Sequence, residues 1–226
     1  MARAKWIRVS IFVASGLATL TLLIGLLHTP LGRPLLARLG VGCPVQASPE
    51  DTERARLESA RATRGAEASP AQPALGFVLD QMTSKDVLAW ADQHHVDCSE
   101  RRAGSLFDCK DVPVSALGGR GSASVDELQL VFSPTSKRLV NIATTQYGLA
   151  ANDAAAQMSA VVSGLEQQLG KPTRELGQRS ASYLDSAPYK TALVRYRFSD
   201  YQADVTATNL PGKGTMLREH YMSARD

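Results

Sequence analysis

The sequence contains few of the residues from which catalytic and metal sites are usually built. Its 226 residues include four His and three Cys, and only 6% are aromatic. No serine lies in a G-x-S-x-G motif, which is typical of α/β-hydrolases. The loop from Asn209 to Thr215 lacks the full G-x-x-x-x-G-K-[ST] spacing of a phosphate-binding loop, and we interpret it as a hairpin turn. These absences disfavour a serine hydrolase of that type and a P-loop nucleotidase.

The folded part of the chain also has no excess of positive charge. Residues 1–73 contain nine Lys or Arg and five Asp or Glu, whereas residues 74–226 contain 16 and 17, so the net charge of +3 comes from the N-terminal segment. A domain that binds nucleic acid usually has a basic excess. We therefore expect no nucleic-acid partner. A hydrophobic content of 44% excludes disorder of the whole chain.

A segment of 19 residues without a charge, Val9–Leu27, lies near the N-terminus. As a helix it would be roughly 28 Å long, close to the hydrocarbon thickness of a bilayer. Arg3, Lys5 and Arg8 precede it, which favours a cytoplasmic N-terminus. We expect residues 1–28 to form a cytoplasmic tip and a transmembrane signal anchor, with residues 6–28 contacting the lipid bilayer. A cleaved signal peptide is the alternative, although the apolar run is longer than signal peptides usually have.

Two connecting segments follow the anchor. Residues 29–43 place Leu31, Leu35 and Leu39 four positions apart, which is typical of an amphipathic juxtamembrane helix. Residues 44–73 read as a polar helix that starts near Ser48, followed by a linker. Leu57 is the only large apolar residue of that helix, so we interpret it as a solvated spacer, with a basic partner-binding helix as the alternative.

Residues 74–226 are expected to form a soluble extracytoplasmic α+β domain with two helices on an antiparallel sheet. A capping box at Thr83 begins the first helix, and Asn152 is expected to cap the second. Alternating segments predict strands at residues 106–114, 127–132, 139–145, 193–198, 203–208 and 216–222. A helix followed by about three strands thus occurs twice, which suggests a tandem α-βββ repeat.

This order of elements resembles small envelope modules of the SmpA outer-membrane-assembly type and the tandem β-lactamase-inhibitory proteins. The resemblance lies in the sequence of elements and not in motif residues. Both kinds of module bind proteins and catalyse no reaction, so the resemblance implies a binding module.

Two cysteines of the domain, Cys98 and Cys109, lie 11 positions apart. Outside the cytoplasm such a pair is typical of a disulfide, which for so short a loop contributes about 2–3 kcal/mol. A zinc site is the alternative, because His94 and Cys98 are one helical turn apart and His95 is adjacent. The spacing matches no established zinc pattern, and His95 falls on the apolar face of the predicted helix. Cys43 remains as a free thiol or an intermolecular bridge.

These features predict a single-pass membrane protein of a bacterial-type envelope, with its C-terminal domain in the periplasm. The lack of catalytic motifs favours a non-catalytic binding module that takes another envelope protein or a cell-wall component and needs no cofactor. The alternative is a hydrolase or zinc-dependent enzyme that uses His94, His95 or His220. Arg195 and Arg197 alternate with aromatic residues, which is typical of a strand with a basic outer face.

Overall fold

The computed structural model describes residues 48–119 and 123–225. Residues 49–226 form the second of the chain's two units, and this unit is compact. The predictions for the anchor, for the juxtamembrane segment and for Cys43 lie outside the described residues. Among the helices in the described part, none is long and apolar enough to cross a bilayer.

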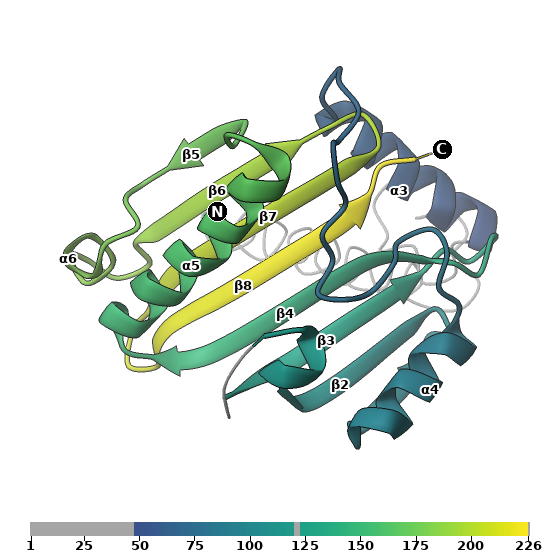
Figure 1. The fold of residues 1–226 in the computed structure, drawn as a ribbon, viewed down its shortest axis with the longest axis horizontal. Coiled ribbons are helices and arrows are strands. Elements are labelled where there is room, and N and C mark those ends of the chain that lie inside the picture. The colour runs from purple at the N-terminus through teal and green to yellow at the C-terminus, as the bar shows by residue number, and fades with distance from the viewer. Residues whose placement is uncertain (1–47, 120–122, 226) are drawn as a thin grey trace, which may run out of the picture. The chain divides into compact units, whose positions relative to one another are not determined.

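The second unit is built on one antiparallel sheet of eight strands (Figure 1). Its spatial order is β1-β2-β3-β4-β8-β7-β6-β5. The strands are β1 (Cys98–Arg101), β2 (Leu106–Pro113), β3 (Ser124–Phe132), β4 (Leu139–Leu149), β5 (Arg174–Leu176), β6 (Thr191–Arg197), β7 (Tyr201–Leu210) and β8 (Gly214–Ser223). The α+β class with an antiparallel sheet is therefore confirmed.

The sheet consists of two halves with the same order of elements. Each half is a helix followed by four consecutive strands, and the halves join where β4 pairs with β8, the last strand of each. The repeat thus has four strands where the sequence predicts three. The missed strands, β1 and β5, form the two edges of the sheet. They are short and almost wholly exposed, so they lack the alternation of apolar and polar residues that reveals a half-buried strand.

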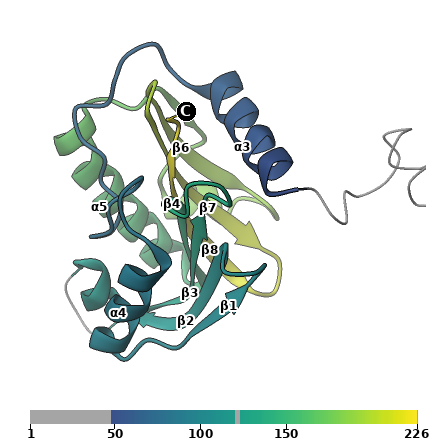
Figure 2. The same cartoon turned by 90° about the vertical axis from the view of Figure 1, so that its right-hand side faces the viewer.

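Both predicted helices cover one face of the sheet (Figure 2). Thr83 caps α4 (Ser84–His94) through the expected capping box with Asp86. The second helix, α5 (Ala151–Leu169), begins one residue before Asn152, and its N-cap, Ala150, makes no side-chain hydrogen bond. The core lies between these helices and the sheet. Its fully buried side chains include Tyr196, Tyr201, Phe107, Phe132, Leu128, Leu130, Leu139, Ile142 and Met158. Two short helices, η1 (Val114–Leu117) and α6 (Ala181–Leu184), lie in connections.

A third helix, α3 (Pro49–Thr63), lies on the opposite face of the sheet (Figure 2). Only Ala60 in it is buried. The helix is held mainly by polar contacts: Gln202 Nε2 donates to Ala60 O at 3.1 Å, and Arg56 Nη1 donates to Ser223 O at 3.0 Å. The helix that the sequence suggests is a spacer therefore packs on the domain. It can do so because the sheet presents polar atoms that a polar helix can satisfy.

The chain after α3 passes very close to the turn between β6 and β7. Gly65 N donates to Phe198 O at 3.2 Å. A Cβ atom at Gly65 would lie 2.2 Å from Arg197 O, so this approach requires glycine. The following segment then crosses the helix-covered face, where Tyr201 Oη donates to Pro73 O at 2.5 Å. Residues 65–73 are thus held by the β6–β7 turn and by the start of β7.

Candidate functional site

The strands alternate their side chains between two faces. We call the face opposite α4 and α5 the open face. Near one end it is covered by α3, and elsewhere its polar side chains reach solvent. Its polar side chains include Arg101, Asp108, Lys110, Glu127, Asn141, Arg218, His220, Gln202, Asp204, Arg195, Arg197 and Arg174.

In the N-terminal half of the open face, charges of opposite sign are paired. Arg101 Nε lies 2.9 Å from Asp108 Oδ2. Lys110 Nζ lies 2.5 Å from Glu127 Oε1, directly across the β2–β3 pair. Each of these cations has its own carboxylate, so this half of the face is locally neutral.

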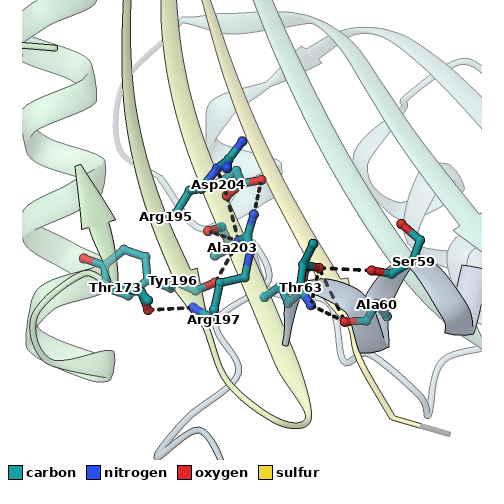
Figure 3. Close-up of polar contacts among 10 residues, drawn as sticks. Ser59, Ala60, Thr63, Thr173, Arg195, Tyr196, Arg197, Ala203 and Asp204 are labelled. Carbon is teal, nitrogen blue, oxygen red and sulfur yellow. Dashed lines mark hydrogen bonds and ion pairs between the residues drawn. The ribbon is translucent and has the colours of Figure 1, made fainter. Parts of the chain in front are cut away.

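In the C-terminal half, the open face carries four arginines, and two of them contact one carboxylate, that of Asp204. We call Arg174, Arg195, Arg197 and Arg218 the arginine cluster. Asp204 on β7 binds Arg197 with both oxygens, at 2.8 Å from Nη1 to Oδ1 and 2.9 Å from Nη2 to Oδ2. Arg195 Nε lies 3.7 Å from the same Oδ1 (Figure 3). The Arg197 guanidinium also donates to the main-chain oxygens of residues 196 and 203, so its position is fixed.

The other two arginines of the cluster have no ion-pair partner among residues 48–119 and 123–225. Arg174 lies directly opposite Arg195 in the β5–β6 pair, and both side chains leave the same face. Arg218 lies between Thr145 and Thr206 on its neighbouring strands. Like charges at directly opposed positions destabilise a sheet. The cluster therefore has more positive charge than its own structure neutralises.

A cavity of about 180 Å³ lies beside the cluster, between α3 and the open face. It is lined by Ser59, Thr63, Arg197, Gln202, Ala203, Asp204, His220 and Met222. Figure 3 shows α3 carrying Ser59, Ala60 and Thr63 beside the strands that carry Arg197 and Asp204. The lining includes hydroxyl, amide and charged groups that can form hydrogen bonds with a small polar group.

One of the three candidate histidines, His220, lines this cavity. A ring nitrogen, Nε2, lies 3.0 Å from Asn141 Oδ1. Burial, together with the nearby Arg218, lowers the pKa of His220 to about 4. Its imidazole is therefore neutral at pH 7. A neutral imidazole can accept a proton, but so low a pKa makes it a weak base.

His94 and His95 lie elsewhere, at the end of α4 on the helix-covered side. His94 contacts the ring of Trp90, with centroids 5.5 Å apart. His95 is the C-cap of α4, with φ 55°, and its side chain is exposed. The sequence places His95 on the apolar face of the helix, but the chain turns into the left-handed conformation there and leaves the helix. No histidines converge in the described residues, and no cluster of metal-ligating side chains forms within them.

Cys98 and Cys109 form a disulfide, as predicted. They are directly opposed partners of the β1–β2 pair, with Cα atoms 4.0 Å apart. The bond ties the short edge strand β1 to the sheet. Its sulfur atoms are thus not available as the zinc ligands that the alternative requires.

A second polar group, Glu219, lies on the helix-covered face of β8. Burial raises the pKa of Glu219, and Tyr221 Oη donates a hydrogen bond to its Oε2 atom. Tyr221 is itself in the core. The sequence does not single out Glu219, because a lone acid in a strand predicts a solvated position.

The cavity brings a serine, a histidine and an aspartate together, but they do not form a relay. In the described part of the chain, no hydrogen bond joins the Ser59 hydroxyl to His220, and none joins His220 to Asp204. A nucleophile and its base need hydrogen-bond reach. The arrangement is better suited to holding a charged ligand than to activating a nucleophile.

The sequence predicts only part of the arginine cluster. The sequence predicts that Arg195 and Arg197 share one basic strand face, but Arg174 and Arg218 come from other strands. The register of β5, β6, β7 and β8 brings them to one face with Asp204. Comparison with known proteins found no matching family model, no matching curated protein and no matching solved structure.

Proposed function

We propose that this chain is a single-pass membrane protein whose C-terminal domain lies outside the cytoplasm and binds an envelope component without catalysis. The observation that carries the proposal is the disulfide between Cys98 and Cys109, since stable disulfides form in oxidising compartments. The uncharged run of residues 9–27 supplies the anchor.

The binding surface in this proposal is the open face. The opposite face is occupied by α4, α5 and residues 65–82, whereas the open face carries ordered polar side chains that reach solvent. Both edges of the sheet are short strands of three and four residues. Short edges are poor templates for an added strand, so recognition through side chains of the open face is favoured over strand addition.

The topology is tested by protease digestion of spheroplasts that express the full chain. We expect externally added protease to remove residues 49–226 while a cytoplasmic marker stays intact. Survival of the domain until lysis would refute the extracytoplasmic orientation. N-terminal sequencing of the mature protein in the same preparation separates an anchor from a cleaved signal, because cleavage after Ala47 would leave Ser48 as the first residue.

The partner is tested by cross-linking in native membranes. The full chain is compared with the double variant Arg174→Gln/Arg195→Gln, and the control is Arg101→Gln/Lys110→Gln on the other half of the same face. Both doubles remove two positive charges. We expect the first to lose cross-links and the second to keep them. Equal patterns for the three proteins would exclude the arginine cluster from the binding surface.

A second candidate is a hydrolase centred on His220, favoured by the presence of Ser59, His220 and Asp204 around one cavity. A fluorophosphonate probe tests it directly, since such reagents label activated serines. The binding proposal expects no labelling of Ser59. Labelling of Ser59 that disappears in His220→Gln would replace the binding proposal with an enzymatic one.

A further inference from the structure

The arginine cluster holds positive charge that the described residues do not neutralise. Asp204 contacts Arg197 with both oxygens, but only Oδ2 accepts a hydrogen bond, and the buried Oδ1 atom has no hydrogen-bond partner. Arg195 is left with one contact at 3.7 Å to that carboxylate, and its buried Nε atom has no hydrogen-bond partner. Arg174 and Arg218 are exposed and have no carboxylate partner among the described residues. Two guanidinium groups on this face thus have no carboxylate partner among the described residues, and a third, that of Arg195, has only the contact at 3.7 Å.

The placement of Arg174 opposite Arg195 has an electrostatic cost in the free protein. Directly opposed residues in an antiparallel pair have neighbouring side chains, and like charges there repel. An anion between the two guanidinium groups would remove that repulsion. The N-terminal half of the same face has no such excess, because Arg101 and Lys110 have their own acids.

We propose that Arg174 and Arg195 bind a phosphate group, on a ligand that extends across the sheet toward Arg218. Guanidinium groups bind phosphate and carboxylate through paired N–H donors. A carboxylate has only two oxygens, which lie in one plane. A phosphate offers non-bridging oxygens in several directions, so two converging arginines can share it.

The spacing of the cluster indicates the kind of ligand. Arg218 lies on β8, three strands from β5, so the strands that carry Arg174 and Arg218 are roughly 14 Å apart across the sheet. One phosphate cannot reach both ends. The ligand has several phosphate groups, either along a polymer or on neighbouring headgroups of a lipid surface. This inference names the chemical class of the ligand in the proposed binding function. It rests on the proposed function only in assuming that the ligand is an envelope component.

The site is tested by calorimetric titration of the full chain in zwitterionic detergent micelles. One arm adds soluble polyphosphate, and a second adds anionic phospholipid to the micelles. A third adds polyglutamate, which carries carboxylates at similar charge. The ionic strength is about 0.15 M, where charges further apart than about 8 Å are largely screened. The variants are Arg174→Gln and Arg195→Gln. The matched control is Arg179→Gln, which also removes one positive charge near the same edge of the sheet. Arg179 differs from the cluster because it forms an ion pair with Glu175 on the helix-covered side.

We expect binding in at least one phosphate arm, weakened about tenfold or more by each of Arg174→Gln and Arg195→Gln and unchanged in Arg179→Gln. Binding in the polyphosphate arm identifies a soluble phosphate polymer, and binding confined to the lipid arm identifies headgroups; both support the site. The proposal is overturned by absence of binding in both phosphate arms, by an equal loss in Arg179→Gln, or by polyglutamate binding as tight as phosphate. Because calorimetry does not depend on membrane orientation, these failures are distinguishable from a failed protease test.

Discussion

The substitution Asp204→Asn tests whether this carboxylate is the structural counter-ion of the arginine cluster. The change keeps the size and shape of the side chain but removes its charge. The Arg197 side chain is only 14% exposed and that of Asp204 23%. The variant therefore leaves a largely buried guanidinium without a carboxylate, beside Arg195 and near Arg218.

The expected cost follows from this burial. Removing one partner of a buried ion pair typically destabilises a protein by about 3–5 kcal/mol, because the remaining charge is uncompensated. Arg197 keeps its two main-chain acceptors, which places the cost near the lower limit, about 3 kcal/mol. For a unit of this length, that corresponds to a decrease in Tm of roughly 6–12 °C.

The assay is urea unfolding at pH 7 of residues 49–226 under oxidising conditions. This fragment retains α3, which packs against Gln202. The control is Glu175→Gln, whose side chain is 42% exposed and whose ion-pair partner Arg179 is 29% exposed. Exposed pairs contribute about 1 kcal/mol or less, so the control should change stability little. A loss below about 1 kcal/mol in Asp204→Asn, or equal losses in both variants, would refute the assignment of Asp204 as a buried counter-ion.

Three further outcomes are expected. Replacing both Cys98 and Cys109 by Ser should lower the free energy of unfolding by about 2–3 kcal/mol without abolishing folding. A reductant should lower the Tm of the wild type, and a chelator should leave the Tm unchanged. A Tm that decreases with chelator would instead support the zinc alternative. The pKa of His220 is about 4 in the folded protein and about 6.5 in the unfolded chain, so between these pH values only the unfolded chain binds the proton. The free energy of unfolding of the wild type should therefore fall by up to about 3 kcal/mol as the pH falls from 6.5 to 4. In His220→Gln this pH dependence should be absent. Parallel stability curves for the two proteins would contradict this. Gly65→Ala should detach the end of α3 from the sheet, because the added Cβ would meet Arg197 O. Limited proteolysis should then cut the segment that directly follows α3 faster than in the control Gly164→Ala, where a Cβ would meet open space.

Local patterns in the sequence were sufficient to predict the elements that bury a regular face. The apolar spacing of α5 and the alternation in β3 report burial directly, because side chains repeat with the period of the element. The capping box at Thr83 is a local hydrogen-bond motif, and the structure has it where the sequence predicts it. The Cys98–Cys109 disulfide could be predicted from the sequence for the same reason, because the two residues are close in sequence and lie on adjacent elements.

The candidate site depends on strand order and register, which no local pattern encodes. Arg174 and Arg218 are 44 residues apart in the sequence, and only the order β8-β7-β6-β5 brings them to one face with Asp204. The packing of α3 on the sheet could not be predicted from the sequence either. It depends on Ala60 and on polar contacts to distant strands, and not on an apolar stripe. Composition and periodicity therefore determined the elements and their class. Tertiary pairing alone decided which charges meet, because an electrostatic cluster depends on distances in space between residues that are far apart in the chain.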